Sequence, residues 1–281
     1  MKSLTTRTGY LLYGLICYAI FFATFLYAIG FVGNAWQSLG LTGGLFHSMD
    51  AGGRATPVGQ ALLIDALVLG LFAVQHSVMA RAAFKRRWTR IVSPAIERST
   101  FVIAASLCLL LLFWQWRPIG TTVLWHVSGG LAQASLVGLS LVGFLIVLLA
   151  TFMIDHFELF GLSQVWTAFR GRSPRRQEFR TPFFYRAVRH PIYLGFIIAF
   201  WATPIMTLGH LVFAAATTGY MLVAIQLEER DLVRSYGDTY RSYRRRVWML
   251  LPLPRLAPGA PTPAISTRPD SSSKDALGPA R

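Results

Sequence analysis

Cysteine is scarce in this sequence, and its scarcity removes two classes of protein. The cysteines are Cys17 and Cys108, which both lie in apolar runs and form no CxxC pair. A disulfide framework and a cysteine-based metal site are therefore excluded. A GxGxxG stretch is also missing, so the glycine-rich turn of a Rossmann nucleotide-binding domain is absent.

Charged residues are scarce as well, at 14% of the chain against about 25% in soluble domains. Acidic residues are the rarer sign, with 12 Asp and Glu against 27 Lys and Arg. A net charge of +15 would suggest nucleic acid in a soluble protein, but here the basic residues cluster in short loops and form no separate domain. We therefore expect no nucleic-acid partner and interpret the charge as the positive-inside pattern of a protein that contacts anionic membrane lipids.

Long apolar runs fill the chain instead, and a bilayer is crossed by roughly 20 apolar residues. Predicted spans lie at residues 10–32, 58–79, 101–116, 131–154, 192–206 and 211–227, with a turn at 207–210. The fifth span is short, so the last two spans either cross fully or form a shorter hairpin. The sequence thus predicts an all-α polytopic integral membrane protein, a bundle of five to six transmembrane helices.

Basic and charge-poor loops alternate along the chain. The N-terminus, the second and fourth connections and the segment after Leu227 are rich in Arg or Lys, whereas the other connections carry at most one Arg each. This alternation predicts that both termini lie in the cytoplasm. Residues 1–256 are interpreted as one membrane-embedded domain, in which residues 228–246 form a charged amphipathic helix. Residues 257–281, rich in Pro, Ser and Gly, are predicted to be a disordered tail.

Two ionisable residues fall inside the second span, where each costs about 2.5–3.5 kcal/mol on insertion scales. Asp65 and His76 are eleven residues apart, which places them on one helical face. In one interpretation they line a polar cavity, with His76 near a reacting centre and with Gln75 and Arg81 beside it. In the other, Asp65 pairs with a neighbouring helix and His76 donates to a backbone carbonyl.

A second cluster, Asp155, His156 and Glu158, ends the fourth span. Its spacing fits no common metal-ligand pattern such as HExxH, so we expect no metal. These residues are either ordinary helix-end residues at the membrane interface or part of a functional site.

The most informative run is Arg189-His190-Pro191-Ile192-Tyr193-Leu194-Gly195, which opens the fifth span. Glu228 and Glu229 close the sixth span, and a tight turn between the two spans would bring both clusters to one membrane face. The glutamates could simply cap the span as solvated charge. Acid on an otherwise basic face also favours a cationic ligand held between carboxylates and a histidine.

The run from Tyr185 to Gly195, followed by Glu228-Glu229, resembles the RHPxYxG stretch and distal EE pair of the isoprenylcysteine carboxyl methyltransferase and phospholipid methyltransferase superfamily. The resemblance covers about residues 179–243. It implies S-adenosylmethionine as cofactor, in a site of about residues 179–246 between two membrane helices and a cytoplasmic cap. The residues implied to hold the cofactor are Tyr185, Arg189, His190, Tyr193, Gly195, Glu228 and Glu229.

Further stretches are similar to the bacterial methanethiol S-methyltransferases, the NnrU-like branch of that superfamily: QHSVMAR at 75–81, PAIERS at 94–99, FWQWRP at 113–118 and DHFELFGL at 155–162. This resemblance implies methyl transfer from S-adenosylmethionine to a small thiol, methanethiol, giving dimethyl sulfide at a bacterial inner membrane. We hypothesise that His76 takes the thiol proton, with Asp65 or Asp155 behind it.

Two other readings of the same scaffold remain open. The acceptor could be a prenylated cysteine or a lipid, which would require a wide lateral opening between helices. The chain could also be a non-enzymatic membrane protein, which would bind no S-adenosylmethionine. The expected partners are the thiol and membrane lipids, and no protein partner is indicated.

Overall fold

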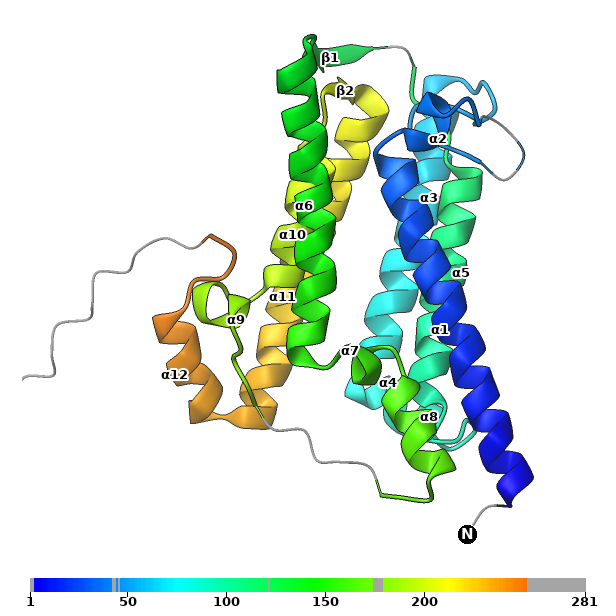
Figure 1. The fold of residues 1–281 in the computed structure, drawn as a ribbon, viewed down its shortest axis with the longest axis vertical. Coiled ribbons are helices and arrows are strands. Elements are labelled where there is room, and N and C mark those ends of the chain that lie inside the picture. Colours follow the sequence, from blue (N-terminus) through cyan, green and yellow to red (C-terminus); the bar gives the residue numbers. More distant parts are fainter. Residues whose placement is uncertain (1–2, 42–43, 45, 121, 174–178, 252–281) are drawn as a thin grey trace, which may run out of the picture.

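A computed structural model describes residues 3–41, 44, 46–120, 122–173 and 179–251. The predicted tail at 257–281 lies outside the described residues. Six helices run along the long axis of the molecule (Figure 1): α1 (Leu4–Val32), α3 (Val58–Ala80), α5 (Glu97–Gln115), α6 (Gly130–Ile154), α10 (Pro191–Trp201) and α11 (Leu208–Tyr236). Five of these, all but α10, are long and apolar enough to cross a membrane. The prediction of an all-α polytopic membrane protein is confirmed.

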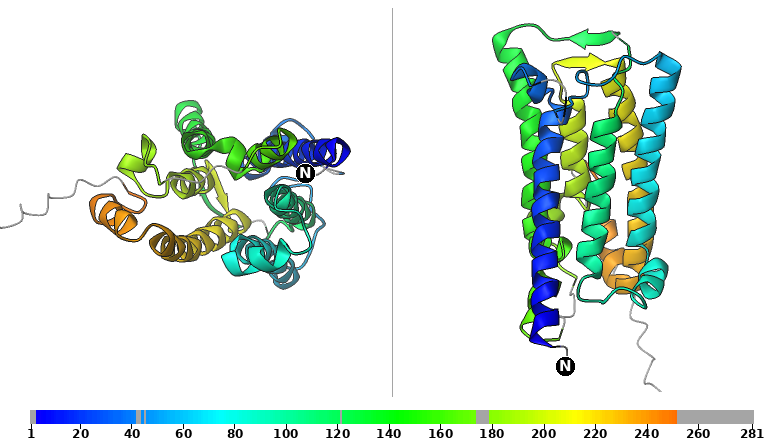
Figure 2. Two further views of the ribbon diagram at one scale, coloured as in Figure 1. Left: turned by 90° about the horizontal axis from the view of Figure 1, so that it is seen from below. Right: turned by 90° about the vertical axis from the view of Figure 1, so that its right-hand side faces the viewer.

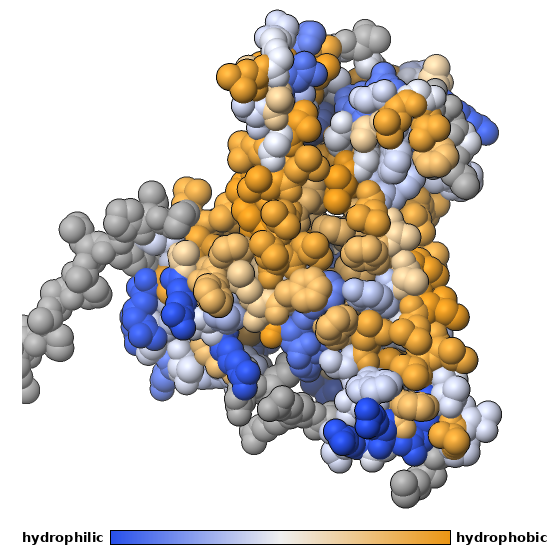
Figure 3. All heavy atoms as spheres, viewed as in Figure 1, coloured by the Kyte–Doolittle hydropathy of each residue, from blue (hydrophilic) through white to orange (hydrophobic). Residues whose placement is uncertain are grey.

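Shorter elements gather at the two ends of this bundle (Figures 1 and 2). One end carries α2 (Ala35–Ser38), β1 (Val123–His126) and β2 (Ile205–Thr207), and is called here the hairpin end. The other end, called the cap end, carries the N-terminus with α4 (Ala82–Trp88), α7 (His156–Leu159), α8 (Leu162–Phe169), α9 (Phe184–Ala187) and α12 (Asp238–Arg246). Between them, hydrophobic side chains cover the middle of the bundle (Figure 3).

The hairpin end holds a feature that the sequence interpretation missed. Strands β1 and β2 pair antiparallel, with Trp125 opposite Met206. The predicted turn at 207–210 is wrong, because the Thr207 hydroxyl accepts a hydrogen bond from the His210 backbone N–H and caps the start of α11. Helix α10 has 11 residues and a length of about 16 Å, far below the bilayer thickness of about 30 Å, so it does not cross alone.

At the cap end, α11 continues beyond the predicted limit at Leu227 and ends at Tyr236. Gly237 then adopts φ +54°, a conformation that glycine tolerates better than other residues, and turns the chain into α12. The charged segment 228–246 is therefore two helices, the last turns of α11 and a separate α12.

Helices α6 and α10 cross closely enough to require glycine on both. A Cβ atom added to Gly143 would lie 2.6 Å from the backbone nitrogen of Ala199, and one added to Gly195 would lie 2.7 Å from the carbonyl oxygen of Gly143. Because the obstructing atoms are backbone, side chains cannot simply move aside. The crossing fixes the position of α10, and Phe144 and Phe200 pack in the core beside it.

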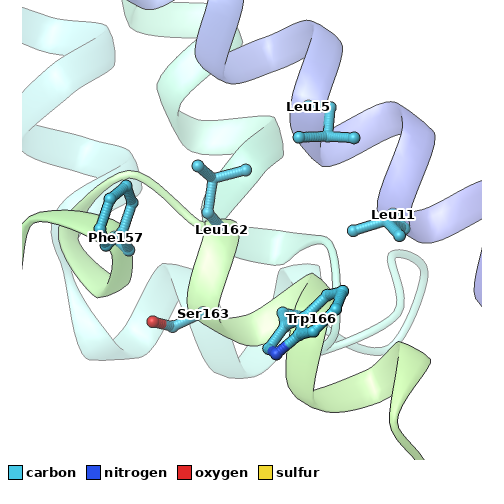
Figure 4. Close-up of a pocket in the computed structure, with 6 residues that line it drawn as sticks. All are labelled: Leu11, Leu15, Phe157, Leu162, Ser163 and Trp166. Atoms are coloured by element: carbon cyan, nitrogen blue, oxygen red, sulfur yellow. The ribbon is translucent and has the colours of Figure 1, made fainter.

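Helix α8 lies against α1 at the cap end and leaves a groove of about 280 Å³ between them (Figure 4). Leu11 and Leu15 of α1 face Leu162 and Trp166 of α8 across this groove. Its lining is apolar apart from Ser163, so it offers no group for acid, base or cofactor chemistry.

Candidate active site

The site begins where an extended segment meets α10. The backbone N–H of Arg189 donates to the Trp248 carbonyl oxygen at 2.8 Å, and that of His190 donates to Met249 at 3.1 Å. Pro191 then occupies the first turn of α10, where its missing N–H is not needed. The segment after α12 is thus paired with the start of α10, and it fixes where both side chains project.

A buried ionic network joins α10 to α11. The Arg189 Nε atom lies 2.7 Å from Oε1 of Glu229, and the His190 Nε2 atom lies 3.1 Å from the same oxygen. All three residues are at most 9% exposed. The second oxygen of Glu229 lies 3.4 Å from Nε of Arg244 on α12. Such a carboxylate is stable in the interior because every neighbour compensates its charge.

Glu228 lies beside this network but is bound much less tightly. Its Oε2 atom accepts a hydrogen bond from the Tyr193 hydroxyl at 3.1 Å and lies 4.0 Å from Nδ1 of His190. The Glu228 side chain is 45% exposed, against 4% for Glu229. Glu228 therefore has carboxylate surface left to bind a ligand, whereas Glu229 organises its neighbours.

The remaining two residues implied to hold the cofactor have other contacts. The Tyr185 backbone carbonyl accepts a hydrogen bond from the Tyr243 hydroxyl at 2.6 Å, and the Tyr185 hydroxyl points to the Ala150 carbonyl at 3.5 Å. Burial raises the pKa of Tyr185 and raises the pKa of Tyr243 to about 12, so both phenols stay protonated donors. Gly195 lies in the crossing with Gly143.

A second set of contacts brings α3 to the same site. The Arg81 guanidinium lies 2.8 Å from a carboxylate oxygen of Asp231, and the Ser77 hydroxyl lies 3.1 Å from that of Tyr220. Asp231 is three residues after Glu228 on α11, which puts the two carboxylates on neighbouring positions of one helical face. Arg81 and Tyr220 also act electrostatically on Tyr193. The C-terminal end of α3 thus adjoins the cluster of Tyr193 and Glu228.

His76 lies next to these contacts, with its ring between two phenylalanines. Ring centroids lie 5.3 Å apart for His76 and Phe72, and 5.0 Å apart for His76 and Phe101. The Nδ1 atom is buried and has no hydrogen-bond partner within the described part of the chain. The charges that act on the ring are the guanidinium groups of Arg98 and Arg81.

The two other predicted catalytic residues lie apart from His76. Asp65 is fully buried and accepts a hydrogen bond from the Arg117 backbone N–H at 2.8 Å, toward the hairpin end. Eleven helical residues separate it from His76 by about 16 Å. Asp155 is exposed and caps α7 by accepting from the Glu158 backbone N–H. Shared periodicity placed Asp65 and His76 on one face, but not at one depth in the membrane.

His156, predicted as part of the second cluster, is buried near α1 in a separate position. Its ring nitrogens lie 2.8 Å from the hydroxyls of Tyr18 and Thr151, and its ring stacks on Phe152. Within the described residues, no group of three His, Cys, Asp or Glu side chains could hold a metal ion.

Sequence reasoning missed three residues of the site, namely Tyr220, Asp231 and Arg244. Asp231 carried a usable signal, since it follows Glu228 at the i+3 spacing of one helical face. Tyr220 is one polar position in an apolar run, and Arg244 is one of three consecutive arginines. The sequence around Tyr220 does not distinguish it from a tyrosine at the membrane interface, and the sequence around Arg244 does not distinguish it from a solvated arginine.

The fold and the site together define a polytopic helical membrane protein with a polar cluster at the cap end, and comparison with known proteins agrees. Residues 133–239 match the family model described as Phospholipid methyltransferase. This region includes most of α6 and all of α10 and α11, and therefore Arg189, His190 and Glu229.

Relatives that match over most of their own length identify the family more closely. The chain is 54% identical to Methanethiol S-methyltransferase 2 of Bradyrhizobium diazoefficiens, over 88% of this chain and 91% of the relative. It is 52% identical to Methanethiol S-methyltransferase of Mycobacterium tuberculosis, over 87% and 96%, and 50% identical to that of Crocosphaera subtropica, over 89% and 94%. The chain belongs to the methanethiol S-methyltransferase family and is an enzyme that transfers methyl groups. No solved structure matches it.

Proposed function

We propose that this enzyme transfers a methyl group from S-adenosylmethionine to methanethiol and releases dimethyl sulfide. The observation that carries the proposal is the position of Glu228. This carboxylate is half exposed in a basic protein, bound by Tyr193, and backed by the closed network of Glu229. A carboxylate held in this way suits a cationic ligand.

The chemistry of these side chains fits S-adenosylmethionine. When bound, this cofactor supplies a methyl group on a positively charged sulfonium. Glu228 has free carboxylate surface for its amino or ribose groups, and Tyr193 has an aromatic face for a cation. A depression of about 320 Å³ next to the site is lined by Val233, Arg241, Arg244 and Arg245 and offers positive charge to a carboxylate.

The proposed binding site for the acceptor thiol lies beside the C-terminal end of α3, which adjoins the donor site. We infer that His76, Phe72 and Phe101 line the chamber, because they combine an apolar wall with one polar atom, Nδ1, that has no partner among the described residues. The chamber would hold the thiol in line with the donor and exclude water, which are the main requirements of a displacement at carbon. Asp65 and Asp155 are left out, since neither lies beside His76.

The proposed location is a bacterial inner membrane with both termini in the cytoplasm. The support is the charge of the segments outside the long helices: α4, α12 and the described residues next to α8 and α9 are basic, and all lie at the cap end with the start of α1. The donor site is at this end too, on the side where S-adenosylmethionine is available.

Product analysis tests the proposal directly. Purified wild-type protein, incubated with methanethiol and S-adenosylmethionine, should release dimethyl sulfide that headspace gas chromatography detects. A methylated phospholipid or prenylcysteine in place of dimethyl sulfide would support the alternative acceptors, and no product from any of them would refute methyl transfer by this site.

Calorimetry tests the donor site separately. Glu228→Ala should abolish measurable binding of S-adenosylmethionine. Asp155→Asn is the control, because Asp155 is an exposed carboxylate at the cap end that caps α7 instead. Retained affinity in Glu228→Ala, or an equal loss in Asp155→Asn, would contradict the assignment of Glu228.

A further inference from the structure

The groups around His76 carry an inference about the state in which the acceptor binds, and it rests on the proposed function. Methyl transfer needs a thiolate, because the thiolate and not the thiol is the nucleophile. A free thiol has a pKa above neutral, so most of it is protonated at neutral pH. The site must therefore stabilise the thiolate, or provide a base near the thiol.

The charges that face His76 are unfavourable for a base. Both charges that act on its ring, those of Arg98 and Arg81, are positive. A proton on His76 would add a third positive charge to this group, whereas a thiolate beside the ring would be attracted by the existing two. The same field therefore opposes an imidazolium and favours an anionic sulfur.

Arg98 acts on the His76 ring more strongly than Arg81 does, and it lies against Phe101, which packs on that ring. Its Cζ atom lies 5.0 Å from the centroid of Phe101, the same ring that lies 5.0 Å from His76. Its Nε atom donates to the Leu159 carbonyl oxygen at 2.6 Å. Arg81 is also paired directly with the Asp231 carboxylate at 2.8 Å, which reduces its effect on the ring.

The other charges that face Arg98 determine what its loss would do. Glu97 on α5 and Glu158 on α7 act on the guanidinium, and Lys85 of α4 lies within electrostatic range of both Arg98 and Glu97. The main electrostatic influence of these two acids is on the Arg98 guanidinium. Without Arg98, they would oppose a nearby thiolate.

We propose that the acceptor binds as a thiolate stabilised by Arg98, with His76 remaining a neutral lining residue that can donate a hydrogen bond to the sulfur. The thiol proton passes to water before methyl transfer. The thiolate sulfur then supplies the electron pair of the new sulfur–carbon bond, and the pair of the broken bond stays on the donor sulfur. Arg98 is thus a positioning residue whose charge selects the reactive form of the acceptor.

The test compares two alkyl thiols of different acidity, and the rate of each variant with a thiol is expressed relative to the wild-type rate with that same thiol. Methanethiol is a weak acid, whereas 2,2,2-trifluoroethanethiol is more acidic and needs less help to ionise. Arg98→Gln should lower kcat/KM for methanethiol about tenfold at neutral pH and raise the midpoint of the pH profile by about 1 unit. The loss should be much smaller for trifluoroethanethiol, and Arg98→Lys should restore most of the methanethiol activity.

Arg170→Gln is the matched control. Arg170 also stacks on an aromatic ring at the cap end, with its Cζ atom 4.8 Å from the Trp166 ring. It belongs to the apolar groove region and not to the site, so both thiols should react as in the wild type.

Several outcomes would overturn the inference. An equal loss for both thiols with an unchanged pH midpoint would show that Arg98 only supports the fold through Leu159. If the rise of kcat/KM with pH disappears in His76→Gln, His76 is the base that accepts the thiol proton. Failure of the wild-type protein to methylate either thiol, with S-adenosylmethionine bound, would instead refute the proposed function.

Discussion

At the cap end of the bundle, Glu229 is bound by two guanidinium groups and an imidazole, whereas at the hairpin end Asp50 and Asp65 are bound by neutral donors. Asp50 accepts from the Asn34 amide at 2.7 Å and from the Thr207 hydroxyl at 2.6 Å. Both ends thus bind buried or half-buried acids, but only the cap end does so with charged partners.

The difference explains why only one end resembles a binding site. Neutral donors fix the Asp50 carboxylate between segments that are distant in the chain, and this holds the loops of the hairpin end together. Cationic partners at the cap end cancel the charge of Glu229 and leave Glu228 as exposed acid on a basic face. The hairpin end therefore offers structural contacts, whereas the cap end offers the exposed carboxylate on which the proposed donor site depends.

The largest expected effect is that of Glu229→Ala. This change leaves Arg189 buried without its main partner, and breaking a buried ion pair in this way costs about 3–5 kcal/mol. Thermal unfolding in detergent should show a large drop in the midpoint, together with loss of S-adenosylmethionine binding by calorimetry. A midpoint within a few degrees of the wild type would show that the network does not hold the cap end.

Gly143→Ala tests whether the fixed position of α10 links packing to the site. The new Cβ would push on the backbone of Ala199, and overpacking of this kind costs about 1–3 kcal/mol. Because α10 begins at His190 and carries Tyr193, we also expect weaker binding of S-adenosylmethionine. Gly138→Ala on the same helix has open space at its Cβ and serves as control. If Gly143→Ala is destabilised but binds S-adenosylmethionine as tightly as the wild type, the α6–α10 crossing does not influence the site.

Asp65→Asn tests whether the buried acid near the hairpin end has a structural role and no catalytic role. The amide oxygen can still accept the Arg117 N–H as a weaker acceptor, while the cost of burying a charged group is removed, so the free energy of unfolding should change by no more than about 1 kcal/mol. Dimethyl sulfide formation per folded protein should stay close to that of the wild type. A loss of turnover of a hundredfold or more would return Asp65 to the reaction and would break the comparison between the two ends.

Tyr243→Phe should have the smallest effect, about 0.5–1 kcal/mol at neutral pH, from the lost bond to the Tyr185 carbonyl. The pH dependence is more informative. Burial raises the pKa of Tyr243 to about 12, above the ordinary value of about 10, so its contribution is complete below pH 10 and is lost as the pH rises toward 12. Unfolding midpoints from pH 7 to 11 should fall less steeply above pH 10 in Tyr243→Phe, and parallel curves would contradict this account.

Sequence reasoning recovered those parts of the fold that depend on long apolar runs. Five predicted spans became long helices because hydropathy over about 20 residues outweighs local detail. The predicted helix boundaries were wrong where single capping residues set them. The Thr207 hydroxyl caps the start of α11, and the backbone conformation of Gly237 ends that helix.

The site was predictable only in part, for a related physical reason. His190 and Glu229 lie near the ends of consecutive spans, so topology alone brings them together, and the structure places them 3.1 Å apart. The partnership of Glu229 with Arg244 depends on the angle between α11 and α12, which no periodicity encodes. The assignment of catalytic roles to His76, Asp65 and Asp155 remains a prediction for activity measurements.

The pairing of residues 188–190 with residues 247–249 has a consequence for the biosynthesis of the enzyme. The earlier segment is synthesised and its helix enters the membrane while the later segment is still to be translated. During that interval Arg189 and His190 lack both the backbone partners of residues 248 and 249 and the carboxylate of Glu229. The proposed donor site is therefore among the last parts of the molecule to assemble during synthesis.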